Sequence, residues 1–181
     1  MIVGRRILPF AAFAVACAAP AGAEVTGQSA TGFATAGSIA IAAPPDSVWA
    51  ALVQPARWWN PEHSWSGNAA NLTLEPVAGG CFCETLASGG SVEHMRVIYA
   101  DPARQLRLSG ALGPLQGEGL AATLTVTLER AGAGTTLAWT YKAGGYTGLP
   151  LAQIAPAVDG VVSEQFARLG SLIETGAAQA R

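Results

Sequence analysis

Residues 42–65 read AAPPDSVWAALVQPARWWNPEHSW, and this stretch decides the fold of the chain. The residues before it, 33–42, predict a first strand, which the two prolines of the stretch end. Asp46 can then cap the free amides of a short helix. A second short helix is expected after Pro55, followed by a loop rich in aromatic residues. A strand that leads directly into two short helices therefore opens the domain.

Downstream of this stretch, strands dominate, because apolar and polar residues alternate along short segments between glycine-rich turns. The expected strands cover 71–75, 81–86, 92–100, 105–109, 121–129 and 135–141. Residues 151–175 instead show the helical spacing of apolar side chains and predict one long amphipathic helix. Together these elements predict an α+β domain, in which a curved antiparallel sheet wraps around a long C-terminal helix. A cavity is expected between sheet and helix.

The order of these segments resembles the helix-grip proteins of the SRPBCC (START-like) superfamily. The stretch quoted above resembles their opening, and three later segments resemble the strands that follow: VAGGCFCE at 77–84, VIYADPARQLRLSG at 97–110 and LAWTYKAGG at 137–145. The resemblance covers about residues 39–175, and is strongest to polyketide cyclase/dehydrase-like proteins and to homologues of a chaperone ATPase activator. It implies the helix-grip fold and a hydrophobic ligand held between sheet and helix. Since a fold does not fix a function, it leaves the activity open.

The first 23 residues have the pattern of a secretory signal. Arg5 and Arg6 precede an apolar run over 7–19, and Ala21-Gly22-Ala23 offers a cleavage site after Ala23. We therefore expect a periplasmic or secreted protein, with lipid attachment at Cys17 as the alternative. The predicted organisation is a signal peptide over 1–23, a flexible leader over 24–32, one domain over 33–176 and a tail over 177–181.

The composition of the sequence and the motifs it lacks argue against several kinds of partner and cofactor. Loss of Arg5 and Arg6 leaves 8 basic against 12 acidic residues, so the exported domain is acidic. Because no basic cluster exists, nucleic acid is not an expected partner. No membrane span is expected once the signal is removed. No cofactor is predicted, because phosphate-binding glycine loops and zinc-protease motifs are missing. The sequence does not indicate an oligomeric state.

The expected partner is a small hydrophobic or amphipathic molecule, held by apolar side chains from several elements. The predicted lining consists of Trp58, Trp59, Trp65, Leu106, Leu108, Leu124, Val126, Trp139, Tyr141, Phe166 and Leu169. Each tryptophan has an alternative role as a filler of the core. The Tyr141 hydroxyl could bind a polar group of a ligand or a nearby backbone carbonyl.

Glu84 and His94 are the most suggestive polar pair for catalysis. If Leu86 pairs with Val92, Glu84 faces His94 across a hairpin and Phe82 faces Arg96, which would allow an acid–base pair. Under that register Cys81, Cys83, Met95 and Val97 share the other, more apolar face. We therefore expect Glu84 and His94 to face solvent as an ordinary cross-strand pair, although a slip of one residue would reverse the faces.

Cys81 and Cys83 have three interpretations. A disulfide is common in exported proteins, but residues two apart in a flat strand are too far from each other, unless a bulge brings them together. A metal site with His94 lacks an obvious fourth ligand. We therefore expect two buried free thiols.

Three functions follow from these observations. The first is an exported, non-enzymatic binding protein for a hydrophobic or amphipathic molecule. The second is a cyclase or hydro-lyase-like enzyme with His94 as base and Glu84 orienting it. The third is a protein-binding adaptor, which would need an exposed apolar patch.

Overall fold

The computed structural model describes residues 24–179 of the chain. The predicted signal peptide, with Cys17, lies outside the described residues and stays a prediction. The strands are β1 (Glu24–Ser29), β2 (Gly32–Ile41), β3 (Leu72–Leu74), β4 (Cys81–Thr85), β5 (Ser91–Asp101), β6 (Gln105–Ser109), β7 (Gly119–Ala131) and β8 (Gly134–Tyr146). The helices are α1 (Pro45–Leu52) and α2 (Leu151–Thr175), with short 3-10 helices η1 (Pro55–Arg57), η2 (Pro61–His63), η3 (Ala69–Asn71) and η4 (Gly113–Gly117).

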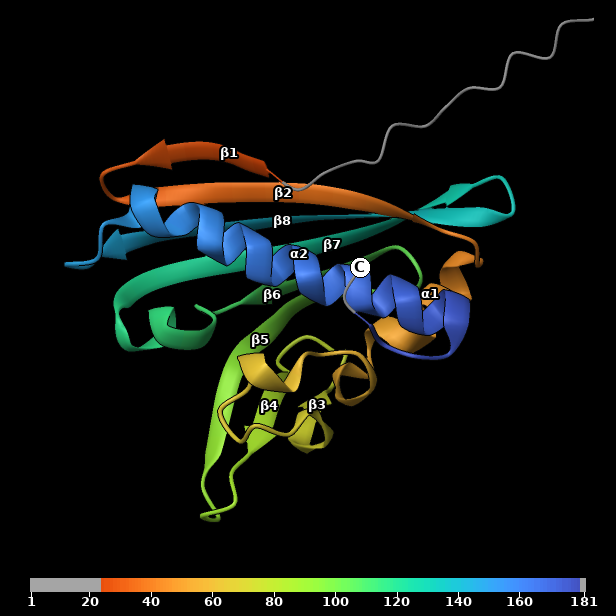
Figure 1. The fold of residues 1–181 in the computed structure, drawn as a ribbon, viewed down its shortest axis with the longest axis horizontal. Coiled ribbons are helices and arrows are strands. Elements are labelled where there is room, and N and C mark those ends of the chain that lie inside the picture. The colour runs from red at the N-terminus through yellow and green to blue at the C-terminus, as the bar shows by residue number, and fades with distance from the viewer. Residues whose placement is uncertain (1–23, 180–181) are drawn as a thin grey trace, which may run out of the picture.

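The eight strands form one antiparallel sheet in the order β1-β2-β8-β7-β6-β5-β4-β3. The sheet curves, and α2 lies along its inner face, packed against β1 and β2 (Figure 1). The predicted α+β helix-grip architecture is therefore confirmed. Every sheet connection links antiparallel neighbours, except the long segment from β2 to β3 that carries α1 and the 3-10 helices.

The core lies between α2 and the long strands β7 and β8. Residues along both strands alternate between buried and partly buried positions, as expected for a sheet with one face covered. The Trp139 ring of β8 stacks on Phe166 of α2, with ring centres 4.7 Å apart. Trp58, from the segment after α1, stacks on the same phenylalanine at 6.2 Å. These rings fill the space in which the sequence predicted a cavity.

Residues 24–29, predicted as part of a flexible leader, instead form β1 and pair with β2. That prediction was wrong because strand pairing uses backbone groups and does not require apolar side chains. Five of the six β1 residues are exposed, so the segment shows no alternation that a sequence could reveal.

The long helix α2 ends at Gly176, whose backbone φ of 79° is the left-handed conformation that glycine adopts easily. The Gly176 N–H donates to the Leu172 carbonyl at 2.9 Å.

Among the helices of the described part of the chain, none is both long enough and apolar enough to cross a membrane.

Candidate functional site

The segment between η1 and η2 is tied to α2 by side-chain hydrogen bonds. The backbone N–H of Asn60 donates to Gln165 Oε1 at 2.7 Å, and its Nδ2 donates to Glu164 Oε1 at 2.7 Å. Arg168 Nε donates to the Trp58 carbonyl at 3.0 Å. Because Gln165 is buried, its bond to Asn60 is shielded from water. These bonds fix the tryptophan-bearing segment as a wall beside α2.

Trp58 and Trp59 have different surroundings within that wall. Trp58 Nε1 donates to the Ala51 carbonyl at 3.0 Å, and its ring is part of the core. Trp59 Nε1 donates to the His63 carbonyl at 2.9 Å, and its ring meets Phe82 edge-on at 5.2 Å. The alternative role as core filler is therefore confirmed for Trp58, while Trp59 stands between the core and an open pocket.

A pocket of about 550 Å³ opens between this wall, residues 112–115 and the first half of α2. The helix contributes Ile154, Ala157, Val158, Val161 and Val162, and residues outside it contribute Leu112, Gly113, Pro114, Leu115 and Leu149. Its polar groups come from Glu62, His63, Ser64 and His94. The pocket is thus largely apolar with a small polar region, which is the usual character of a small-molecule site.

Of the predicted lining residues, Trp59 and Trp65 border this pocket. Six others surround a separate void of about 30 Å³: Trp58, Leu106, Leu108, Leu124, Val126 and Phe166. Trp139, Tyr141 and Leu169 border neither space and are buried in the core. The open pocket therefore lies beside the core, at one end of the space between sheet and helix, and not within it.

Sequence reasoning missed the residues that form most of the pocket. Ile154, Val158 and Val161 follow the helical spacing that predicted the long helix, but this spacing does not distinguish the wall of a pocket from the core. Leu112 and Leu115 lie in a glycine- and proline-rich segment that was treated as a plain loop. The available signal was the presence of these apolar residues in a loop, where polar residues are more usual.

Tyr141 is hydrogen-bonded to the 112–115 segment that borders the pocket. Its hydroxyl oxygen accepts a hydrogen bond from the Leu112 N–H at 3.1 Å, so the backbone partner is an amide and not the carbonyl that was expected. Burial raises the pKa of Tyr141 to about 12, although the Leu112 hydrogen bond acts in the opposite direction. The residue is therefore a neutral, fixed support.

The β4–β5 hairpin departs from the regular pairing that the sequence suggested. Glu84 pairs with Val92, and Phe82 pairs with Met95. The register shifts at Phe82/Cys83, where β5 carries one extra residue, His94. This extra residue is a β-bulge, which changes the direction of nearby side chains.

The bulge turns two consecutive residues of β5 inward. His94 and Met95 are both buried, whereas neighbours in a regular strand face opposite sides. Glu84 is 1% exposed and His94 is 4% exposed, so the prediction of a solvent-facing pair was wrong. Met95 and Val97, predicted to share a face with the two cysteines, are also buried. Arg96 stays on the exposed side, where it pairs with Glu93.

The Glu84 carboxylate accepts three hydrogen bonds at the back of the pocket. The Trp65 N–H donates to Oε2 at 3.0 Å, and the Ser66 N–H donates to Oε1 at 2.6 Å. His94 Nε2 lies 2.9 Å from Oε2. Burial alone would raise the pKa of Glu84, but its hydrogen bonds to Ser66, Trp65 and His94 outweigh burial and hold the pKa below its ordinary value. The carboxylate therefore stays ionised inside the protein.

His94 lies between Glu84 and the pocket. Because an ionised carboxylate has no proton to donate, the proton in their hydrogen bond belongs to His94 Nε2. Burial lowers the pKa of His94, and the hydrogen bond and charge of Glu84 offset this only in part. Its ring packs on Phe82 with centres 5.0 Å apart. Near neutral pH the imidazole is therefore uncharged.

Lowering the pH is expected to destabilise the protein in two stages. The pKa of His94 is lowered from 6.5 by folding, so below about pH 6.5 the unfolded chain gains a proton that the folded state resists. The pKa of Glu84 is lowered from 4.5, so its stabilisation is present above that pH and lost as the pH falls through its folded value. Urea unfolding between about pH 8 and about pH 4 measures both stages.

His94→Gln provides the comparison that assigns the first stage. This variant should lose the fall in stability that begins near pH 6.5 and keep the fall below 4.5. Asp159 acts in the opposite direction, because burial raises its pKa, but it does so equally in both proteins. An identical pH dependence in the two proteins would contradict the assignment.

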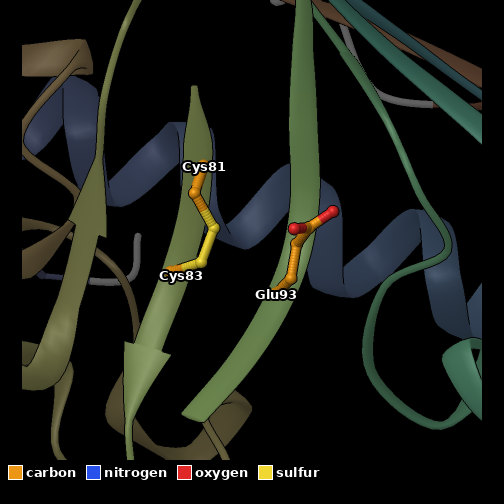
Figure 2. A group of neighbouring side chains, drawn as sticks. All are labelled: Cys81, Cys83 and Glu93. Carbon is orange, nitrogen blue, oxygen red and sulfur yellow. A yellow bond between two sulfur atoms is a disulfide. The ribbon is translucent and has the colours of Figure 1, made fainter. Parts of the chain in front are cut away.

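Cys81 and Cys83 form a disulfide on the outer side of β4, with Cα atoms 5.3 Å apart (Figure 2). The expectation of two free thiols was wrong because it assumed a flat strand. Two residues of a flat strand span about 6.6 Å, at about 3.3 Å per residue, whereas these Cα atoms are 5.3 Å apart, so β4 departs from a flat strand here.

Among the residues that the structure describes, His94 does not lie with Cys81 and Cys83 in a group that could bind a metal ion. Within the described residues, the one group with metal-binding side chains close together is Cys81, Cys83 and Glu93. Its two sulfur atoms are bonded to each other, and a disulfide is not the thiolate that binds metals. His94 borders the pocket and is not part of this group, whose three side chains are shown in Figure 2.

Comparison with known families gives one match, to a family described as polyketide cyclase/dehydrase and lipid transport, over residues 33–174. The matched segment runs from β2 to the end of α2 and includes every element of the pocket. A search of curated proteins found no match.

Solved structures with the same fold come from several bacteria. A conserved protein of unknown function from Enterococcus faecalis is 17% identical, with 83% of this chain and 76% of that chain covered and a TM-score of 0.56. CalU16 from Micromonospora echinospora is 20% identical, with 79% and 75% covered and a TM-score of 0.52. A protein from Rhodobacter sphaeroides is 24% identical, with 83% and 96% covered and a TM-score of 0.51. At these identities the likeness concerns the fold.

Proposed function

Because the chain belongs to the polyketide cyclase/dehydrase and lipid transport family, we propose that it binds a small hydrophobic or amphipathic molecule. The observation that carries this proposal is the pocket of about 550 Å³ between α2, the Trp59–Trp65 wall and residues 112–115. Its size falls in the range of about 300–1,000 Å³ that is usual for ligand sites.

The distribution of polar groups suggests how such a ligand would be oriented. Side chains of α2 and of residues 112–115 supply the apolar surface, and burial of apolar surface drives affinity. His94 and Ser64 lie among the few polar lining residues. An apolar molecule with one polar group would therefore place that group near them.

We propose further that the protein works outside the cytoplasm, after cleavage behind Ala23. The disulfide between Cys81 and Cys83 supports this location, because disulfides persist in oxidising compartments. Intact-mass measurement of the protein from the periplasm or the medium of its own host tests the cleavage site. A mature chain that still begins at Met1 would contradict it.

Filling the pocket is expected to weaken ligand binding. Ala157 is exposed on α2 and borders the pocket, so Ala157→Trp places a large ring in the open space without touching the core. The neutral apolar fluorophore N-phenylnaphthylamine is the probe. We expect its affinity to fall at least about tenfold, which is about 1.4 kcal/mol.

Ala152→Trp is the matched control, because Ala152 is also exposed on α2 but does not border the pocket. This variant should bind the fluorophore as the unchanged protein does. Equal affinity of Ala157→Trp and the unchanged protein, or no binding by any of the three proteins, would overturn the proposed function.

A further inference from the structure

We propose that His94 is a catalytic base, which takes a proton from an uncharged apolar molecule held in the pocket, and that Glu84 is the positioning residue that orients its imidazole. This inference rests on the proposed function, since the pocket must first hold such a molecule. It is carried by three features: the position of His94 in the pocket wall, its hydrogen bond to a buried carboxylate, and the bulge that turns it inward.

The hydrogen bonds fix which nitrogen of His94 can act as a base. Glu84 is held by the backbone N–H groups of Trp65 and Ser66, so its oxygens are fixed in position. The Glu84–His94 bond keeps the proton on Nε2. In the described part of the chain, the His94 ring makes no other hydrogen bond, which leaves the lone pair on Nδ1 free to accept a proton.

The surroundings keep the base in its active, uncharged form. Burial favours the neutral imidazole, while the charge of Glu84 stabilises the imidazolium that forms when Nδ1 accepts a proton. The other titratable groups that border the pocket are Glu62 and His63 on η2, and His63 lies 3.3 Å from Glu164 on α2. Apart from the two histidines, the titratable groups at or beside the pocket are the carboxyl groups of Glu62, Glu84 and Glu164.

The same charges indicate the class of substrate. An anion would meet the negative charges of Glu84 and Glu62, and a charge of either sign is costly to bury against the largely apolar lining, so the pocket favours an uncharged molecule. The reaction is abstraction of a proton from a carbon next to an electron-withdrawing group. The C–H bond breaks, its proton forms a bond to Nδ1, and its electron pair shifts into the substrate to form a new π bond or expel a leaving group. The imidazolium then returns the proton to the product or to water.

A purely structural role for the pair would look different in an experiment. If Glu84 and His94 served only to hold residues 65 and 66 on the hairpin, their loss would change stability but not the rate of a reaction in the pocket. If His94 is the base, the rate must follow the ionisation of His94 and vanish with its side chain. The pH profile of a rate therefore separates the two roles.

The probe reaction is the elimination of 5-nitrobenzisoxazole, an uncharged aromatic compound that needs only a base. The base takes the proton on C3 of the isoxazole ring, the C–H electron pair completes a nitrile, and the N–O bond breaks to give a coloured phenolate. We expect the protein to accelerate this reaction, with a rate that rises with pH through a midpoint below 6.5 and then levels off. His94→Gln should lose the acceleration by at least about a hundredfold, the scale expected for a general base.

Two variants test the role of Glu84. Glu84→Gln should lower the plateau rate and shift the midpoint to lower pH, because the charge that favours the imidazolium is removed. Glu93→Gln is the matched control, since Glu93 is the neighbour of His94 on β5 but pairs with Arg96 on the exposed side. It should leave the rate and the profile unchanged.

A second measurement does not depend on whether the His94→Gln variant folds, because it uses the unchanged protein. The chain has two histidines, so nitrogen NMR of the unchanged protein, with His63→Gln for assignment, reports the tautomer of each ring. We expect His94 to carry its proton on Nε2 and to titrate below 6.5. A proton on Nδ1, or a rate that His94→Gln retains, would overturn the proposal.

The outcomes also separate this inference from the proposed function. If N-phenylnaphthylamine binds and Ala157→Trp weakens it, but elimination is not accelerated, the catalytic role falls and ligand binding stands. If the fluorophore does not bind and elimination is not accelerated, both fall. Acceleration that depends on His94 and is blocked by Ala157→Trp supports both.

Discussion

Glu84→Ala is expected to lower the free energy of unfolding by about 3–4 kcal/mol, because it removes the buried carboxylate that accepts hydrogen bonds from three donors. The Trp65 and Ser66 N–H groups lose a charge-assisted bond, and His94 Nε2–H loses its partner. Each buried donor left unpaired costs about 1–3 kcal/mol, but Trp65 and Ser66 lie near the surface, where water can replace part of the loss. Urea unfolding at neutral pH measures the change.

Glu93→Ala is the control for this prediction. Glu93 lies on the neighbouring strand and pairs with Arg96, but both side chains are about half exposed. Pairs of this kind contribute about 0–1 kcal/mol, so the control should remain close to the unchanged protein. A loss of similar size in both variants would show that Glu84 does not hold residues 65 and 66 on the hairpin.

Gly37→Ala is expected to cost about 3 kcal/mol, the upper part of the usual range for overpacking a core. A β-carbon at position 37 would lie 2.3 Å from Cζ2 of Trp139. The Trp139 ring cannot move away easily, because it is 3% exposed and stacks on Phe166. Thermal or urea unfolding would show the loss, together with a change in tryptophan fluorescence.

Gly27→Ala tests whether the effect comes from packing. Gly27 lies on the edge strand β1, and the nearest atom to a β-carbon there is 3.9 Å away. Its replacement should change stability by less than about 0.5 kcal/mol. If Gly37→Ala were equally mild, the close packing of Trp139 against β2 would be contradicted.

The parts of the fold that depend on local patterns could be predicted from the sequence. The alternation in 121–129 and 135–141 located β7 and β8, and the helical spacing in 151–175 located α2. β1 could not be found in this way, because its side chains are mostly exposed and only its backbone pairs. The resemblance to helix-grip proteins predicted the order of the elements and that the long C-terminal helix covers one face of the sheet.

The site was harder to predict because it depends on one irregularity and on distant contacts. A regular hairpin would place His94 and Met95 on opposite faces, and alternation alone does not announce a bulge. The disulfide of Cys81 and Cys83 likewise depends on a local departure of β4 from a flat strand, which the sequence does not reveal. The position of the pocket depends on which aromatic rings pack into the core. This packing brings together residues that are far apart in the sequence.

The hydrogen bonds from Asn60 to Glu164 and Gln165 connect residues more than a hundred positions apart. During synthesis, a chain that has emerged only as far as β8 has neither the helix that lines the pocket nor the two side chains that fix its wall. The pocket is therefore completed last, when nearly the whole chain is available. A shortened protein that ends before α2 would therefore lack this pocket.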